Sequence, residues 1–283
     1  ADIDNKNLKV KVGTQNTTSS DVVQIVLKEQ NTIVAMTKGV VGETLELALA
    51  DVKLWSPESP FLYDLEVTLL DKGKKTDKVK SYAAMRKISM HKDKDGIMRM
   101  QLNNKDCFQF GPLDQGWWPD GLYTAPTDEA LAYDIEKTKD WGFNMIRKHI
   151  KVEPARWYTH CDRLGILVWQ DMPSGDNSPK WIQYNYFDGK ENERSIESEE
   201  NFKKEWREIM DYLMPYPSIV VWVPFNEAWG QFKTKEIAEW TEYYDPSRLV
   251  NAASGGNHYY KVGDILDIHR YPRPELMMYE PTQ

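Results

Sequence analysis

The sequence feature that most restricts the fold of this chain is one continuously apolar run, Ile219-Val220-Val221-Trp222-Val223. Five consecutive apolar residues, most of them β-branched, indicate a strand that is buried on both faces, and such strands are typical of parallel sheets. Parallel strands are joined by long crossover connections, usually helices. The run therefore predicts an α/β region in which apolar strands alternate with helices.

The chain after residue 100 shows this alternation. We expect strands at residues 107–111, 143–149, 166–172, 219–225, 249–253 and 265–271. Helical patterns with recognisable ends lie between them: Thr127 can cap the first, and Gly165 can end the second. Alternating strands and helices predict βαβ units, in either an open doubly wound sheet or a barrel. No glycine-rich nucleotide loop follows the first expected strand, which argues against dinucleotide binding.

The first 100 residues have a different rhythm. Tyr63, Leu65, Val67 and Leu69 alternate with polar residues, which is the period of a half-buried strand, and residues 23–27 and 45–49 repeat the pattern. About seven short strands over such a length predict an immunoglobulin-like β-sandwich. We therefore expect a sandwich over residues 1–100 and an α/β domain over residues 101–283.

Chain length restricts the second domain. A closed (β/α)8 barrel needs eight strands and typically about 250 residues. Too few residues follow residue 100 for that, and only about six strands are recognisable. If the domain is a TIM barrel, we expect it to be incomplete, with its C-terminal part missing.

Composition excludes several kinds of partner. The net charge of −8 and the pI near 5.3 argue against a broad phosphate-binding surface, so no nucleic-acid partner is expected. No apolar run approaches the roughly 20 residues of a membrane-spanning helix. The two cysteines, Cys107 and Cys161, cannot form a disulfide framework or a four-cysteine zinc site.

Polar residues collect where the expected strands end, which is where parallel βα folds place their active sites. These residues are Arg147, His149, Asp171, Asn226, Glu227, Ser254, His269 and Tyr271. Glu227 follows one of the most apolar stretches of the chain, and partial desolvation there would favour the protonated carboxyl group that a general acid needs. The alternative is a loop glutamate that caps a helix or pairs with Arg147.

Several segments resemble glycoside hydrolase family 2, which includes β-galactosidases, β-glucuronidases and β-mannosidases. Residues 223–230, Val-Pro-Phe-Asn-Glu-Ala-Trp-Gly, are similar to the Asn-Glu acid/base segment of that family. Residues 54–63 and 85–88 resemble its immunoglobulin-like domain, and residues 162–171 and 216–222 resemble its third and fourth barrel strands. The resemblance covers nearly the whole chain in the family's order.

The resemblance implies a retaining mechanism with two carboxyl groups, one an acid/base and one a nucleophile. Glu227 matches the acid/base, Asn226 the neighbour that binds the sugar 2-hydroxyl, and Arg147 an arginine that orders the acidic site; a structural ion pair is the alternative for Arg147. Further substrate contacts are expected from Asp171, Trp229, His269 and Tyr271. No cofactor is expected, an oligomer is possible, and a periplasmic or secreted location is favoured.

Substrate assignment is divided. Gln170-Asp171 is closer to the mannosidase-like form of strand three, whereas Asn226-Glu227-Ala228 is closer to the galactosidase-like form. The family's nucleophile follows strand seven, which we do not find; Glu275 and Glu280 follow no apolar strand and are not assigned to that role. We therefore expect an internal fragment of a β-galactosidase-like glycosidase, inactive or nearly so alone. The alternative is a non-catalytic carbohydrate-binding or scaffold relative.

Two other motifs have alternative interpretations. Trp117-Trp118 could form a sugar-stacking platform or simply pack within a loop. His258, Asp264, Asp267 and His269 could suggest a metal, but their spacing matches no standard site, so none is expected.

Overall fold

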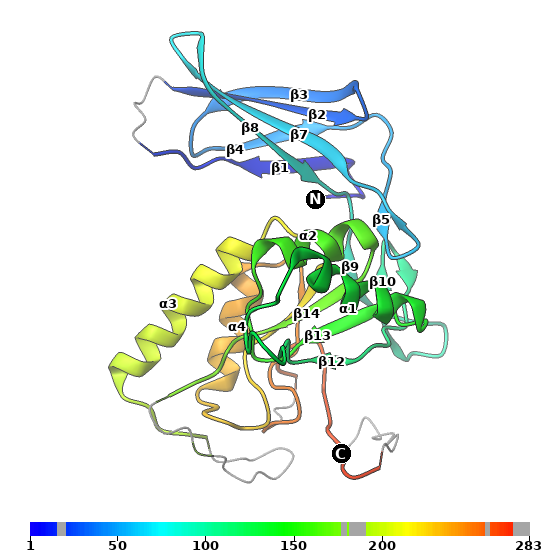
Figure 1. The fold of residues 1–283 in the computed structure, drawn as a ribbon, viewed down its shortest axis with the longest axis vertical. Helices are drawn as coiled ribbons and strands as arrows, with labels where there is room; N and C mark the ends of the chain where they lie inside the picture. The colour runs from blue at the N-terminus through cyan, green and yellow to red at the C-terminus, as the bar shows by residue number, and fades with distance from the viewer. Residues whose placement is uncertain (16–20, 177–179, 181–190, 258–260, 274–283) are drawn as a thin grey trace.

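The computed structural model describes residues 1–283 except 16–20, 177–179, 181–190, 258–260 and 274–283. The chain forms two parts, a β-sandwich and an α/β part, stacked along the long axis of the molecule (Figure 1). No helix among the described residues is both long enough and apolar enough to span a membrane.

The sandwich contains one four-stranded and one two-stranded antiparallel sheet. The larger sheet has the order β3 (Thr32–Val40), β2 (Val22–Glu29), β7 (Tyr63–Asp71), β8 (Lys74–Ala83), and the smaller pairs β1 (Asn7–Lys11) with β4 (Thr44–Ala48). Their apolar faces enclose a core that includes Leu8, Ile25, Leu27, Leu47, Tyr63 and Leu65. The apolar residues of the predicted alternation therefore form the core between the two sheets.

Short strands connect the two parts. β5 (Trp55–Ser56) pairs with β6 (Ser59–Pro60), and a three-stranded sheet contains β9 (Ile88–Lys92), β10 (Met98–Leu102) and β11 (Lys105–Asp106). This small sheet straddles residue 100, so the domain boundary expected there stays a prediction.

The α/β part is built on a five-stranded parallel sheet. Its order is β12 (Leu113–Asp114), β13 (Met145–Lys148), β14 (Leu167–Asp171), β15 (Ile219–Val223), β16 (Leu249–Val250). The helices are α1 (Asp128–Asp140), α2 (Ala155–Leu164), α3 (Ile196–Leu213) and α4 (Thr234–Tyr244). Every residue of β15 is buried, as the apolar run predicts. Consecutive strands lie side by side, which is the arrangement of a partly formed barrel.

The helix ends follow the expected signals. Thr127 Oγ1 accepts a hydrogen bond from Ala130 N at 3.1 Å and caps α1. Gly165 ends α2 in the left-handed conformation, with φ of +76°. α3 buries Phe202, Trp206, Met210 and Leu213 against the sheet.

The prediction for the first parallel strand was wrong in position. Residues 107–111 do not form it; β12 begins at Leu113. The side chain of Asn144 explains the difference, because its Oδ1 accepts from Phe110 N and its Nδ2 donates to Phe108 O, both at 2.8 Å. These backbone groups are satisfied by a side chain, and regular parallel pairing starts only after Pro112.

The sixth expected strand was also wrong as a full strand. Residues 265–271 contribute a single parallel bridge, between Ser254 and Asp267. Among the residues that the structure describes, the parallel sheet therefore has five strands rather than six, although Gly255 N still donates to Asp267 O at 3.3 Å. The segment runs parallel to the neighbouring chain, as a barrel strand would, but it does not form the repeated backbone hydrogen bonds of a strand.

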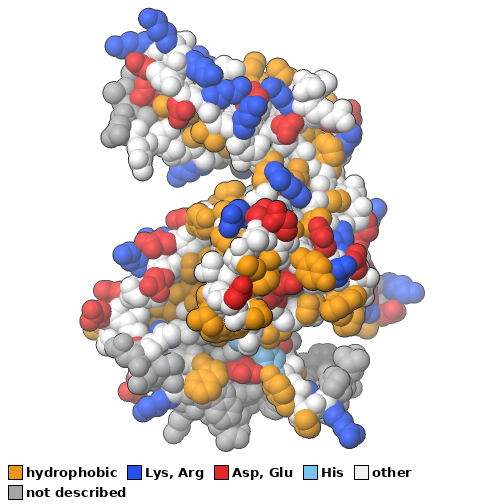
Figure 2. Space-filling model, viewed as in Figure 1, with side chains coloured by type: hydrophobic (Ala, Val, Ile, Leu, Met, Phe, Trp, Pro, Cys, Tyr) orange, Lys and Arg blue, Asp and Glu red, His pale blue; other side chains and the backbone are white. Residues whose placement is uncertain are grey.

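An apolar surface lies along the β12 edge of the sheet. Figure 2 shows hydrophobic side chains gathered on the face of the α/β part that carries α1 and β10. Phe108, Phe110, Leu113 and Trp141 are large exposed side chains of this region. An exposed sheet edge with apolar neighbours is unusual in a finished domain.

The fold is an immunoglobulin-like sandwich followed by an incomplete (β/α)8 barrel.

Buried polar contacts join the two parts. Arg86 donates to the carbonyl oxygens of Pro217, Ser247 and Ile219 at 2.7–2.9 Å. Asp162 on α2 accepts from Tyr82 OH of the sandwich at 2.6 Å and from Ser218 N at 2.8 Å. Because both side chains are almost completely buried, these bonds fix how the sandwich sits on the barrel.

Candidate active site

A buried polar cluster occupies the carboxyl ends of β13, β14 and β15. Arg147 Nε and Nη2 donate to Asp171 Oδ1 and Oδ2 at 3.0 and 2.7 Å, and Nη2 also donates to Asn226 Oδ1 at 2.7 Å. Ile150 N donates to Asp171 Oδ2 at 3.1 Å. The cluster joins three neighbouring strands and holds the residue immediately before Glu227.

Burial dominates the electrostatics of this cluster. It raises the pKa of Asp171 to about 6, although the Arg147 guanidinium favours the ionised form. Burial, together with the positive charge of Arg147, lowers the pKa of His149. Asp171 is therefore a structural counter-ion to Arg147, with no solvent-facing surface to offer a sugar. This geometry differs from the direct substrate contact expected for Asp171.

Glu227 lies on a tight loop just beyond β15. Its backbone N donates to Ser254 O at 2.8 Å, and Ser254 N donates to Phe225 O at 2.9 Å, so strand-like pairing continues to the site. Glu227 and Ala228 have φ of +49° and +63°. Left-handed backbone costs a non-glycine residue on the order of 1 kcal/mol or more, and such strain is common at functional sites. The loop thus turns the Glu227 side chain across the end of the sheet.

His269 and Tyr271 reach the same carboxylate oxygen. His269 Nδ1 lies 2.7 Å from Glu227 Oε1, and Tyr271 OH donates to that oxygen at 3.2 Å. The Glu227 side chain is 29% exposed, so it is held by protein groups and still open to solvent. A carboxyl group of this kind can give a proton to, or take one from, a bound molecule.

The sequence did not assign a role to Ser254 and Asp267, which hold His269. Ser254 Oγ lies 3.0 Å from His269 Nε2 and donates to Asp267 Oδ2 at 2.5 Å; Asn251 Nδ2 donates to the same oxygen at 2.8 Å. Asp267 and His269 are two residues apart, so in an extended segment they face the same side. That spacing could have indicated a shared polar network.

The remaining predicted aromatic contacts differ in placement. Trp229 lies two residues after Glu227 on the same loop and is half exposed, and Tyr271 is largely exposed beside Glu227. Trp117 packs edge-on against Tyr123, with ring centroids 4.4 Å apart, on the loop after β12. The structure brings these predicted residues together as two adjacent bonded groups, Arg147 with Asp171 and Asn226, and Glu227 with His269 and Tyr271. Trp117 belongs to a separate loop contact.

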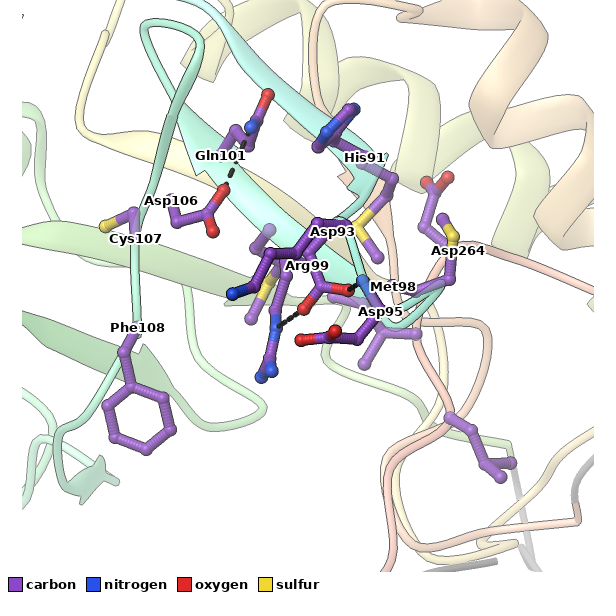
Figure 3. A pocket seen from close by; sticks show the side chains of 15 residues that line it. His91, Asp93, Asp95, Met98, Arg99, Gln101, Asp106, Cys107, Phe108 and Asp264 are labelled. Atoms are coloured by element: carbon purple, nitrogen blue, oxygen red, sulfur yellow. Dashed lines mark hydrogen bonds and ion pairs between the residues drawn. The ribbon is translucent and has the colours of Figure 1, made fainter. Parts of the chain in front are cut away.

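A separate cavity, with a volume of about 890 Å³, lies between the β9–β10 hairpin and residues 264–266 (Figure 3). Its charged side chains pair locally, as Arg99 does with Asp93 at 2.9 Å. Asp264 precedes the segment that ends at His269, so this cavity lies toward the amino ends of the strands. In TIM barrels the residues at that end contribute to stability, whereas the active site lies at the carboxyl ends. No group of three potential metal ligands occurs among the described residues.

Comparison with known proteins agrees with this architecture. Residues 1–86 match the family described as glycosyl hydrolases family 2, and residues 123–278 match the TIM barrel domain of that family. The second match alone covers more than half of the chain. This chain belongs to glycosyl hydrolase family 2.

Its relatives include β-galactosidases and β-glucuronidases. The β-galactosidase of Lactococcus lactis subsp. lactis is 26% identical in an alignment of 242 positions, which covers 80% of this chain and 22% of that protein. A putative β-glucuronidase of Formosa agariphila is 26% identical in an alignment of 286 positions, which covers 94% of this chain and 30% of that protein. The chain thus spans about a fifth to a third of these relatives.

Solved structures share the fold. A β-glycosidase from Bacteroides vulgatus superposes with a TM-score of 0.67 at 21% identity, covering 87% of this chain and 31% of that one. A β-glucuronidase from Bacteroides uniformis gives 0.65 at 22% identity, covering 86% and 30%. At these identities the likeness supports the architecture alone.

Proposed function

We propose that this family 2 chain carries the acid/base half of the active site of a retaining β-glycosidase. The observation that carries the proposal is the Glu227 carboxyl group, which stands at the mouth of the sheet with its Oε1 bonded to His269 and Tyr271. Glu227 would protonate the leaving oxygen of the glycoside and later take a proton from the attacking water.

Arg147 and Asn226 have supporting roles in this proposal. Asn226 is fixed through its Oδ1 by Arg147, which orients its amide nitrogen for a sugar hydroxyl. Trp229 and Tyr271 offer exposed aromatic surface for a sugar ring beside Glu227. A β-galactoside is the proposed substrate class, supported by the names of relatives such as the Lactococcus lactis enzyme.

A retaining mechanism also needs a nucleophilic carboxylate roughly 5–5.5 Å from the acid/base. The other carboxylates of the network are already engaged: Asp171 by Arg147, and Asp267 by Ser254 and Asn251. We propose that the nucleophile comes from outside the described residues and that the 283-residue chain alone has little or no activity. Glu275 and Glu280 lie outside the described residues.

Hydrolysis of 4-nitrophenyl β-D-galactoside and β-D-glucuronide tests this proposal. Two proteins are compared, this chain and the polypeptide encoded by its complete reading frame, each with and without Glu227→Gln. We expect no turnover by the chain and turnover by the complete polypeptide that the substitution greatly reduces. Turnover by the purified chain, lost in Glu227→Gln, would contradict its inactivity.

A non-catalytic carbohydrate-binding role is the second candidate, favoured by the exposed rings of Trp229 and Tyr271. It predicts sugar binding by the complete polypeptide without any hydrolysis. Mutation separates the two, because an enzyme loses rate in Glu227→Gln and keeps sugar binding, whereas a binding module has no rate to lose.

A further inference from the structure

The His269 ring is engaged through both of its nitrogens. Nδ1 lies 2.7 Å from Glu227 Oε1, and Nε2 lies 3.0 Å from Ser254 Oγ. A neutral imidazole has one N–H donor and one acceptor nitrogen, and a protonated ring has two donors. The partners of the ring therefore reveal where its hydrogens must lie.

The hydrogen bonds of Ser254 determine whether Nε2 of His269 carries a hydrogen. A serine hydroxyl has one hydrogen, and the Ser254 oxygen lies 2.5 Å from Asp267 Oδ2, which also accepts from Asn251. An ionised carboxylate only accepts hydrogen bonds, so the Ser254 hydrogen is used on Asp267. The hydroxyl can then only accept from His269, which means that Nε2 carries a hydrogen.

The two other neighbours of Nε2 do not compete with this arrangement. Arg147 Nη1 is 3.5 Å away, beyond the normal range for an N–H donor, and Asp267 Oδ1 is 3.9 Å away. Ser254 Oγ is therefore the hydrogen-bond partner of Nε2.

With a hydrogen on Nε2, the short contact between Nδ1 and Glu227 Oε1 still needs one hydrogen, which either atom can carry. We propose that His269 and Glu227 share this single proton and act as an acid/base dyad. The dyad is held in place through Ser254, Asp267 and Asn251. His269 is a positioning residue in this dyad, since it acts on the substrate only through Glu227.

The dyad deepens the proposed function and rests on it. In the first step the shared proton passes from Glu227 to the glycosidic oxygen as the bond from that oxygen to the anomeric carbon breaks and the nucleophilic carboxylate bonds to the carbon. In the second step Glu227 takes a proton from water as the water oxygen bonds to the anomeric carbon and the bond from that carbon to the nucleophile breaks, so that the proton returns to the dyad. Tyr271 cannot replace His269, because nearby Glu227 raises the pKa of Tyr271 and keeps its hydroxyl protonated.

Nuclear magnetic resonance of the histidine rings tests the proposal without any turnover. The chain has five histidines, so 15N-histidine labelling gives few ring signals, and a His269→Asn variant identifies those of His269. Long-range 1H–15N correlations show which ring nitrogen is protonated. The signals of the other four histidines report whether each variant remains folded.

We expect Nε2 of His269 to be protonated near neutral pH and the Nδ1 resonance to lie between the protonated and unprotonated positions. Glu227→Gln should move Nδ1 to the unprotonated position, because the amide donates to it and has no proton to share. Ser254→Ala should populate the tautomer protonated on Nδ1 alone. Tyr271→Phe is the matched control, since it removes another Glu227 partner and should leave the His269 tautomer unchanged.

Two results would overturn the dyad. One is an Nε2 without hydrogen in the unsubstituted chain. The other is an Nδ1 resonance that is identical with and without Glu227→Gln while the remaining histidine signals are intact. Either result would leave the hydrolysis assay of Glu227 unaffected, so failure of the dyad and failure of the proposed function can be distinguished.

Discussion

Arg147 donates hydrogen bonds to both carboxylate oxygens of Asp171, from Nε to Oδ1 at 3.0 Å and from Nη2 to Oδ2 at 2.7 Å. The pair is almost wholly buried, and the same Nη2 holds Asn226. Two adjacent parallel strands are thereby tied to the residue before Glu227. A planar guanidinium can make this forked contact, whereas a lysine ammonium cannot.

Loss of Arg147 should destabilise the chain strongly. Arg147→Met leaves the Asp171 carboxylate buried without a counter-ion, and breaking buried pairs in this way costs about 3–5 kcal/mol. Urea unfolding monitored by circular dichroism measures the change. Lys203→Met is a matched control, since its ion pair with Glu236 is solvent-exposed and worth about 0–1 kcal/mol. Equal losses in the two variants would contradict the account.

Asp162 should make stability depend on pH. Burial raises its pKa to about 7, so the folded state holds a proton that the unfolded state has released. The contribution of Asp162 to the free energy of unfolding is therefore greatest at or below about pH 4 and is lost as pH rises to about 7. Asp162→Asn should flatten the pH dependence in that window. An unchanged slope in urea unfolding would show that Asp162 does not titrate there.

Gly255 should be needed to seat His269. A Cβ at Gly255 would lie within 2.3–2.6 Å of the His269 ring, and the backbone has φ of +62°. Gly142 has φ of +85°, and a Cβ there would meet nothing within 4 Å, so Gly142→Ala isolates the backbone strain of about 1 kcal/mol. We expect Gly255→Ala to lose more stability and to shift the His269 ring signals. Shifts as small as those in Gly142→Ala would contradict the close packing.

Much of the fold could be predicted because its signals are local. The period-two alternation at Tyr63 and Leu65, and the fully apolar β15, each depend on burial that a sequence pattern records. The place where the first parallel strand starts could not be predicted in this way. It depends on the Asn144 side chain, which bonds to backbone groups more than 30 residues earlier.

The candidate site was predictable to the level of strand ends. Those ends placed Arg147, Asn226 and Glu227 together, because parallel strands finish at one edge. Which groups bond to each other was not predictable, since it depends on loop geometry such as the left-handed backbone at Glu227. The contact of His269 with Glu227 and the burial of Asp171 against Arg147 are examples, and substrate contact by His269 stays a prediction.

The most direct test of the account is the leaving-group dependence of hydrolysis by the polypeptide encoded by the complete reading frame. A general acid helps most when the leaving group is poor, typically by about 10²–10⁴-fold. We predict that Glu227→Gln lowers kcat/KM by that order for alkyl β-glycosides and far less for 2,4-dinitrophenyl β-glycosides. Equal losses for both classes, or no loss for the alkyl substrates, would contradict the assignment of Glu227 as the acid/base.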